Sequence, residues 1–311
     1  MRAAVVDRYG APEVVRVVEV PRPEPRAGEV LVRVRAVAVT AGDARIRAAR
    51  FPAGFGVVGR LAVGLRGPRR PVLGGSFSGE VVAGEGFAPG EDVCGMAGVR
   101  LGAHAEYAAV PAAKLVRKPT GVSHEDAAGL LFGGSTALFF LRDKGSVKAG
   151  DKVLVNGASG AIGTNAVQLA KHFGAEVTAV TSARNAELVR SLGADHVLDY
   201  TTGALDRTTD RYDLVLDTVG TLSIKSGRRL LTDDGTLLLA VATLADTLRA
   251  RGNVVAGVAP ERPEAFAFLL DLVAKSALRV VVDDVHDLSD IVRAHHRVDS
   301  GRKVGNVIVR P

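Results

Sequence analysis

The sequence holds very little cysteine and no long apolar run. One cysteine, Cys94, stands among 311 residues. A lone cysteine closes no intramolecular disulfide and builds no four-cysteine zinc site, so the fold requires no oxidising compartment. The longest apolar stretches, such as residues 236–245, reach about ten residues, whereas a transmembrane helix needs ~20. Residues 1–10 carry no apolar segment of signal-peptide length. We therefore expect a cytoplasmic protein with no membrane partner.

Aromatic residues are scarce, and the positive charge is dispersed. Aromatics make up 5% of the chain, tryptophan is absent, and 40 Lys and Arg against 34 Asp and Glu give a net charge of +6. The densest basic stretch, residues 66–71, contains no interleaved aromatic residue of the kind that stacks nucleic-acid bases. We interpret it as a solvated loop and expect no nucleic-acid partner. The net positive charge would also attract an anionic cofactor.

The composition and the length favour a globular protein of two domains. Apolar residues make up 47% and charged residues 24% of the chain. Residues 1–118 predict a β-rich domain, because valine and alanine alternate with arginine over residues 30–38, the period of half-buried strands. Glycine and proline separate further short apolar runs of this region, such as residues 72–77.

The pattern changes over residues 119–259, where short apolar runs alternate with helical segments. Residues 151–158 and 213–219 are predicted strands, with a helix predicted over residues 161–173. This alternation is typical of a Rossmann-type, doubly wound parallel sheet, which places the protein in the α/β class. Residues 260–311 mix helices with short strands.

The segment VLVNGASGAIGTNAVQLAKHFG carries the strongest chemical signal. A strand runs into a glycine-rich turn and then a helix, the context in which a dinucleotide pyrophosphate meets free N–H groups at a helix N-terminus. Ala158 stands where the strict motif has its first glycine, and the alternative is a glycine-rich turn that binds something else. The predicted phosphate contacts are Gly157, Ala158, Ser159, Gly160, Ala161, Ile162 and Gly163.

The next strand predicts which dinucleotide is bound. NAD sites usually place an Asp or Glu at the end of this strand, to bond the ribose hydroxyls. Here Thr181, Ser182 and Arg184 lie close together with no acid among them. A hydroxyl and a guanidinium would hold a 2′-phosphate that a carboxylate would repel, so we predict NADPH. The alternative for Arg184 is a solvated residue at a helix start.

Several stretches together resemble the medium-chain dehydrogenase/reductase superfamily, and more narrowly its zinc-independent quinone oxidoreductase branch. They include the glycine-rich segment above, GGSFSGEVVA at residues 74–83, FGGSTAL at residues 132–138 and AHHRVDSGRKVGNVIV at residues 294–309. The resemblance implies a GroES-like catalytic domain over residues 1–118, a Rossmann domain over residues 119–259, and a segment over residues 260–311 that returns to the first. It also implies a nicotinamide in the cleft between the domains and a homodimer.

The residues present argue against a catalytic zinc ion. Zinc members of the superfamily use a cysteine in the first domain and a histidine in a G-H-E motif. This chain has neither at residues 38–43 or 74–80, and the adjacent His295 and His296 do not have ligand spacing. We therefore expect no metal. The acceptor must then carry its own electron sink, as a quinone or an α,β-unsaturated carbonyl does.

The resemblance also implies the remaining site residues. Thr40 and Asp43 are the candidate catalytic residues, although the branch's usual N-Y-I-D is reduced here to Thr40, Ala41, Gly42 and Asp43, and Asp43 could instead cap a helix or bond Arg47. The other expected cofactor contacts are Thr136, Tyr200, Asp217, Val219, Gly220, Ala240, Val241, Ala242 and Asn306.

Residues 51–71 form a long glycine-rich segment, which we predict to be a loop flanking the substrate mouth. Phe51, Phe55 and Leu61 would form its apolar wall.

Two other functions stay open. A biosynthetic enoyl reductase would share every residue named above, and a non-catalytic NADPH-binding protein would bind the cofactor without turnover.

Overall fold

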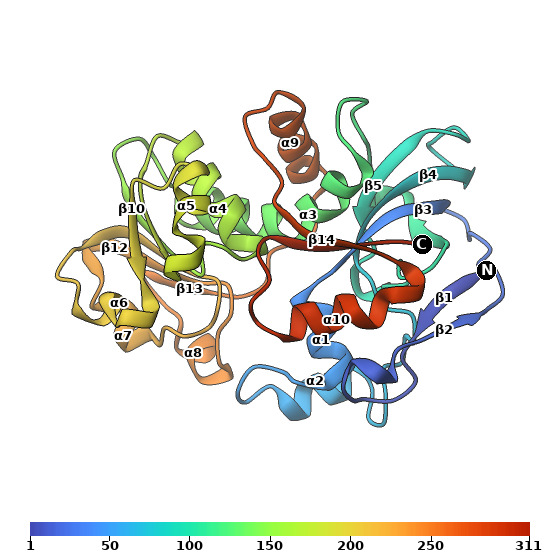
Figure 1. The fold of residues 1–311 in the computed structure, drawn as a ribbon, viewed down its shortest axis with the longest axis horizontal. Coiled ribbons are helices and arrows are strands. Elements are labelled where there is room, and N and C mark those ends of the chain that lie inside the picture. Colours follow the sequence, from blue (N-terminus) through green and yellow to red (C-terminus); the bar gives the residue numbers. More distant parts are fainter.

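The computed structural model describes all 311 residues as two domains that share one long helix between them (Figure 1). The first and last parts of the chain form the β-rich domain, and the middle of the chain forms the Rossmann domain. The predicted α/β class, with a parallel Rossmann-type sheet and a separate β-rich domain, is confirmed.

The β-rich domain is built on a seven-stranded sheet of predominantly antiparallel pairing. Its order is β14 (Val282–Asp287), β15 (Asn306–Arg310), β3 (Glu29–Val39), β4 (Ser76–Gly84), β5 (Asp92–Met96) and β7 (Leu115–Arg117), with β6 (Tyr107–Pro111) paired to β3. A separate hairpin joins β1 (Arg2–Val5) and β2 (Arg16–Glu19). Its α-helices are α1 (Ala41–Ala48), α2 (Gly56–Val63) and α10 (Ile291–Asp299). The last strands of the chain thus lie beside β3 rather than in the Rossmann sheet.

The Rossmann domain has a six-stranded parallel sheet. Its order is β10 (His196–Asp199), β9 (Glu176–Thr181), β8 (Lys152–Asn156), β11 (Tyr212–Asp217), β12 (Leu231–Leu239) and β13 (Val254–Ala256). The order in which the chain adds strands reverses between β8 and β11, and ligands of such sheets bind at the carboxyl ends of the strands at this point. The helices that follow these strands are α4 (Ala161–His172), α5 (Ala186–Ser191), α6 (Ala204–Arg207), α7 (Ile224–Arg228), α8 (Leu244–Arg249) and α9 (Pro263–Ala274).

Short irregular turns complete the chain. The 3₁₀ turns are Pro12–Val14, Gly98–Arg100, Ala112–Lys114, Ala183–Asn185, Tyr200–Thr202 and Leu288–Asp290, and a π-helical turn covers Phe139–Lys144. None of the helices combines the length and the apolarity that crossing a bilayer requires.

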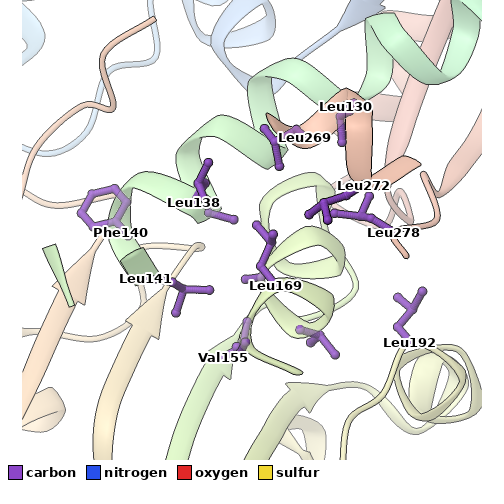
Figure 2. Close-up of a cluster of buried hydrophobic side chains, with 14 of the residues drawn as sticks. Leu130, Leu138, Phe140, Leu141, Val155, Leu169, Leu192, Leu269, Leu272 and Leu278 are labelled. Atoms are coloured by element: carbon purple, nitrogen blue, oxygen red, sulfur yellow. The ribbon is translucent and has the colours of Figure 1, made fainter. Parts of the chain in front are cut away.

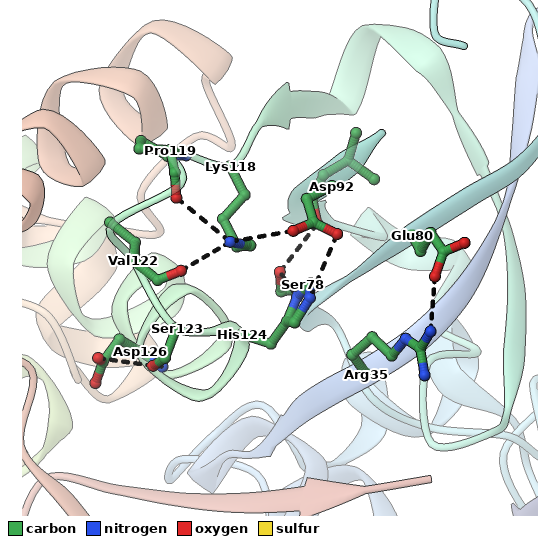
Figure 3. Close-up of polar contacts among 11 residues, drawn as sticks. Arg35, Ser78, Glu80, Asp92, Lys118, Pro119, Val122, Ser123, His124 and Asp126 are labelled. Atoms are coloured by element: carbon green, nitrogen blue, oxygen red, sulfur yellow. Dashed lines mark hydrogen bonds and ion pairs between the residues drawn. The ribbon is translucent and has the colours of Figure 1, made fainter. Parts of the chain in front are cut away.

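Helix α3 (His124–Leu138) joins the two domains. Its N-terminus is capped by Ser123, whose hydroxyl accepts from the Asp126 N–H at 3.0 Å. Lys118, just before the helix, donates from its buried Nζ to the Val122 carbonyl at 2.8 Å and pairs with Asp92 of β5 (Figure 3). Ser78 of β4 and His124 are hydrogen-bonded at 2.8 Å. These bonds fasten the start of α3 to the β-rich domain.

The rest of α3 belongs to the largest apolar core. Leu130 and Leu138 of α3 pack with Leu169 of α4 and with Leu269 and Leu272 of α9 (Figure 2). Fully burying each of these side chains contributes about 1.5–3 kcal/mol, so this core holds the two domains in a fixed relation.

Two local predictions differ from the structure. Residues 51–71, predicted as a loop, contain the eight-residue helix α2. Within the apolar run at residues 72–77, the strand begins only at Ser76, because Gly74 adopts φ +90° and turns the chain. In contrast, the alternation of β3 is confirmed, since Arg33 and Arg35 are exposed between buried neighbours.

Candidate active site

The turn between β8 and α4 is shaped by glycines that no other residue could replace. Gly157 has φ +82°, and a Cβ there would lie 2.3 Å from the Val219 side chain. A Cβ on Gly163 would lie 2.1 Å from the Gly157 carbonyl oxygen, so this glycine lets the helix pack tightly on the strand. The space around Gly160 is open, because a Cβ there would meet only the Gly157 carbonyl oxygen, at 3.4 Å. A ligand can therefore approach the backbone at Gly160.

The N-terminus of α4 is free to bind an anion. No side chain caps it, its first turn contains no acidic residue, and Gly160 at the N-cap contributes only backbone. Unpaired N–H groups and the helix dipole together favour a phosphate at this position.

The end of β9 brings three polar side chains together beside this turn. The Ser159 hydroxyl accepts from Thr181 Oγ1 at 3.0 Å and from Asn185 Nδ2 at 3.1 Å. No carboxylate joins these contacts, and Arg184 is exposed, with its guanidinium 3.5 Å from the Arg302 carbonyl. The role of Asn185 could not be predicted from the sequence, because Ser159 lies 26 positions earlier in the chain and only the fold brings the two side chains together. Ser182 is half-buried beside this group, and Tyr200 lies 60% exposed past the end of β10.

Asp217, at the end of β11, organises the loop that follows it. Its fully buried carboxylate accepts four hydrogen bonds, from Asn156 Nδ2 at 3.0 Å and from three backbone N–H groups. Those N–H groups belong to Val219 at 2.9 Å, Gly220 at 3.1 Å and Leu222 at 2.8 Å. Both oxygens of the Asp217 carboxylate are therefore bonded within the chain, and Asp217 holds the loop of residues 219–222 in place.

The loops after β11 and β12 lie against each other. A Cβ on Gly220, which has φ +87°, would lie 2.7 Å from Val241 Cγ1. Ala240 donates its N–H to the Asp217 carbonyl at 3.0 Å, and Val219 is 49% exposed. Ala240, Val241 and Ala242 are half-buried. These expected cofactor residues therefore form one continuous edge beside the turn at Gly157.

The C-terminal segment contacts the turn between β8 and α4. Gly305 donates its N–H to the Ser159 carbonyl at 2.8 Å and forms an isolated parallel bridge with Gly160. Asn306 is buried, donates from Nδ2 to the Val281 carbonyl at 3.0 Å and lies against Gly129 of α3. The β-rich domain thereby directly contacts the glycine-rich turn between β8 and α4, which we call the phosphate turn.

Thr40 and Asp43 lie at the same junction. In the register of β15 and β3, Val307 is opposite Val39, which places Thr40 next to Asn306. Thr40 and Asp43 form a reciprocal cap on α1, with the hydroxyl donating to Asp43 Oδ2 at 2.6 Å, and Asp43 Oδ1 accepts from the Gly74 N–H at 3.0 Å. Asp43 therefore makes the capping contact foreseen as one alternative, while Arg47 bonds Gly10 and Asp299 instead.

Helix α3 packs directly against α4. A Cβ on Gly133 would lie 2.2 Å from the Ala161 carbonyl oxygen, so α3 and α4 touch backbone to backbone. Thr136, almost one turn later, is half-buried and donates its hydroxyl to the Phe132 carbonyl at 2.7 Å. Thr136 thus presents a methyl group and a hydroxyl that is already engaged.

The predicted substrate wall is partly assembled. Phe51 and Phe55 are half-buried, and the Phe51 ring lies so close to Gly59 of α2 that a Cβ there would be 2.6 Å away. Leu61 lies on the outward side of α2 and is 57% exposed. Leu244 of α8 donates its N–H to the Ala53 carbonyl at 2.9 Å, so this segment touches the Rossmann domain.

Lys303 is a second residue that sequence reasoning did not single out. Lys303 is half-buried, its Nζ donates to the Gly305 carbonyl at 2.5 Å, and desolvation lowers the pKa of the ammonium to about 8. Asp283 opposes that shift, and Arg297 adds to it. In the sequence, the adjacent basic residues Arg302 and Lys303 before the last strand were the only indication of this site. A cation at Lys303 lies close to the turn between β8 and α4, because Gly305 bonds Ser159 of that turn.

The possible metal ligands are dispersed. No three His, Cys, Asp or Glu side chains come together in a way that could hold a metal ion. Cys94 is buried in β5, where burial raises the pKa of its thiol to about 12, and it lies in no group of three possible ligands. His104 and His295 are buried with ring centroids 5.9 Å apart, but both ring nitrogens of His295 lack a partner.

Comparisons with known proteins agree with this architecture. Residues 26–120 match the family described as alcohol dehydrogenase GroES-like domain, and residues 192–309 match the family described as zinc-binding dehydrogenase. The scattered donors do not fit the zinc ion that the second description names. The chain is 30% identical over 324 residues to a chloroplast envelope quinone oxidoreductase homolog of Arabidopsis thaliana, covering 94% of this chain and 93% of that protein.

Solved structures resemble the whole chain. The quinone oxidoreductase from Coxiella burnetii superposes with a TM-score of 0.89 at 28% identity, covering 100% of this chain and 99% of the other. A mycobacterial protein complexed with NADPH has a TM-score of 0.82 at 29% identity, with full coverage of both chains. The likeness therefore extends over both domains and the cleft between them.

Proposed function

Because this chain belongs to the quinone oxidoreductase-like branch of the medium-chain dehydrogenase/reductase superfamily, we propose that it is a zinc-independent, NADPH-dependent reductase of quinones or α,β-unsaturated carbonyls. The observation that carries the proposal is the uncapped N-terminus of α4 beside the acid-free group of Ser159, Thr181 and Asn185. The first suits a pyrophosphate, and the second leaves room for a 2′-phosphate.

The cofactor is NADPH, and it supplies the hydride when it is bound. The chain's own residues bind and orient it. The amides of the α4 N-terminus would hold the pyrophosphate, and the acid-free end of β9, with Ser182 and Arg184, would hold the adenosine phosphate. Asp217 fixes the loop that would lie over the cofactor, and Thr136 and Asn306 would lie beside the nicotinamide.

The choice of acceptor follows from the donor set of the cleft. No group of side chains could hold a Lewis-acidic metal against a simple ketone, so carbonyl reduction would have no strong electrophile. A quinone or an enone accepts hydride at carbon and spreads the negative charge onto its own oxygen. One proton then completes the two-electron reduction.

We propose that the acceptor lies between Thr40 and the wall formed by Phe51, Phe55 and Leu61. The cap between Thr40 and Asp43 fixes the end of β3, and Asp43 also holds the turn at Gly74, so Asp43 is a positioning residue. The half-buried phenylalanines provide apolar surface for a ring.

The test is NADPH oxidation by the purified protein, followed by absorbance, with NADH in parallel and a chelator present. The acceptors are 1,4-benzoquinone, 9,10-phenanthrenequinone, an alkenal and a cyclic enone. Chelator-resistant turnover that prefers NADPH is expected. Turnover lost to the chelator would refute zinc independence, and tight NADPH binding without any turnover would indicate a binding protein.

Arg184→Glu tests the cofactor assignment separately. A carboxylate there would repel the 2′-phosphate, so KM for NADPH should rise about tenfold while KM for NADH changes little. Arg190→Glu, an exposed change on the neighbouring helix α5, is the matched control. Equal effects of the two substitutions on NADPH would contradict the assignment.

We further propose a homodimer located in the cytoplasm. Strand β13 is an edge strand of the Rossmann sheet, and Val258, just after it, is 92% exposed, so pairing of two sheets through this edge would cover both. Light scattering after size exclusion should give twice the mass of the chain. A monomer that is unchanged by concentration would contradict the dimer.

A further inference from the structure

Helix α2 exposes apolar side chains to solvent, whereas helices of soluble domains usually bury them. It contains no buried residue, and Val57, Val58 and Leu61 are 73%, 56% and 57% exposed. Gly59 meets the protein, packed against the Phe51 ring, while Val57 and Leu61 lie on the opposite side of the helix and Val58 lies beside them. Leu65, just past the helix, is 64% exposed as well. Burial within its own domain therefore does not explain this sequence.

A second exposed element continues the same surface from the other domain. Helix α8 touches the segment before α2, through the bond from Leu244 N–H to the Ala53 carbonyl, and its Leu248 is 78% exposed. Figure 1 shows α7, α8 and α2 along the lower side of the molecule in this view, away from α9 at the top. We call the exposed side of α2, residues 64–70, α7 and α8 the mouth surface.

The mouth surface is also cationic. A hollow between α7 and α8 is lined by Lys225, Arg228, Arg249 and Arg251, with Asp246 as its one acid. None of these four cations takes part in an ion pair. The Asp246 carboxylate is engaged by the Thr243 hydroxyl at 2.9 Å, in the cap of α8. On the α2 side, the exposed Arg66, Arg69 and Arg70 follow the helix.

We infer that the mouth surface docks on an anionic lipid bilayer. Exposed apolar side chains of one short helix, flanked by unpaired arginines, are the features of a segment that lies in the headgroup region. The apolar side chains would enter the acyl boundary, and the cations would meet anionic headgroups. Lying on a bilayer is a different mode from crossing it, so this contact needs no membrane-spanning helix.

The position of the surface links docking to the cleft. The bond between Leu244 and Ala53 lies two residues beyond residues 240–242, which form one edge of the cofactor site. A bilayer against this surface would face the opening beside Phe51 and Phe55. An apolar acceptor dissolved in the bilayer would then reach the cleft without crossing water. Docking itself does not depend on the proposed reductase activity, and its test uses no substrate.

The experiment measures co-sedimentation with vesicles of phosphatidylcholine containing about one third phosphatidylglycerol, and with pure phosphatidylcholine vesicles, at low and high salt. Binding to the anionic vesicles that weakens with salt is expected. Val57→Glu should lower the partition coefficient about tenfold, and Arg249→Glu with Arg251→Glu should do the same. Urea unfolding midpoints establish that each variant is folded.

Two controls separate docking from general attraction. Val99→Glu changes a side chain that is 94% exposed near Glu261 and the start of α9, remote from α2. Lys148→Glu with Lys152→Glu removes the same charge at the amino end of the Rossmann sheet. Both should bind vesicles as the unchanged protein does.

Three results would overturn the inference. The unchanged protein could fail to bind anionic vesicles at low salt. The two controls could lose as much binding as the mouth-surface variants, which would reduce the effect to net charge. Val57→Glu could instead convert a dimer to a monomer with vesicle binding unchanged, which would make the mouth surface an interface between copies of the chain.

Discussion

Replacing Asp217 by asparagine tests how the loop over the cofactor is held. The carboxylate accepts three hydrogen bonds on Oδ1 and one, from Leu222 N–H, on Oδ2. An asparagine oxygen can keep the first three, but its amide group then faces the Leu222 N–H, donor against donor. Losing that bond and leaving the N–H unpaired costs about 1–3 kcal/mol, and the three remaining bonds lose their charge assistance.

Part of this cost is offset, because asparagine no longer requires a charge to be buried. We therefore expect the free energy of unfolding to fall by about 2 kcal/mol. The displaced loop should also raise KM for NADPH several-fold, with a smaller change in kcat. Urea unfolding with and without NADPH measures both effects, since a ligand stabilises only the state that binds it.

Asp234→Asn is the matched control for this substitution. Asp234 lies exposed on the neighbouring strand β12, and removing its charge should leave both the stability and KM unchanged. The reasoning would be refuted if Asp217→Asn unfolded at the same urea concentration as the unchanged protein. It would equally fail if stability fell while KM for NADPH stayed constant, because the loop would then be irrelevant to the cofactor.

Three further outcomes follow from the same geometry. Gly163→Ala, whose Cβ would meet the Gly157 carbonyl at 2.1 Å, should abolish detectable NADPH binding by fluorescence, whereas Gly150→Ala, with nothing within 4 Å of its Cβ, should cost only stability. Burial lowers the pKa of Lys303 to about 8, so its positive charge disappears above that pH; KM for NADPH should rise there, and Lys303→Met should remove the rise. Burial holds the pKa of His295 well below its usual 6.5, so between pH 6.5 and the folded-state pKa only the unfolded chain binds the proton. The free energy of unfolding should therefore fall by up to about 1.4 kcal/mol for each unit by which the pH is lowered in this range. Urea unfolding at several pH values should show a smaller pH dependence for His295→Leu.

Local patterns predicted the parts of the molecule that local physics controls. The glycine spacing over residues 157–163 encodes a positive φ and a close approach of strand and helix, and both are present at Gly157 and Gly163. The alternation in β3 depends on residues at most a few positions apart. The lack of an acid after β9 is equally a property of neighbouring residues.

The tertiary structure decided what depends on distant partners. The residues around Asn185 in the chain do not indicate that it bonds Ser159. The residues around Lys303 likewise do not indicate that it lies beside the phosphate turn. The position of Asp217 at the end of β11 predicts a cofactor contact, but its carboxylate oxygens accept hydrogen bonds from Asn156 and from the loop that follows β11.

Helix α2 shows the same limit most plainly. Its apolar residues repeat as they would in a helix packed on a core, and a sequence pattern records only this periodicity, which is the same whichever side the helix presents. Only the contacts of Gly59 with Phe51 and the exposure of Val57 show that the apolar side faces outward. The sequence by itself therefore determined the fold class and the cofactor turn, because periodicity and backbone conformation are local. Which faces meet, and which remain open to a partner, depended on how segments far apart in the chain pack.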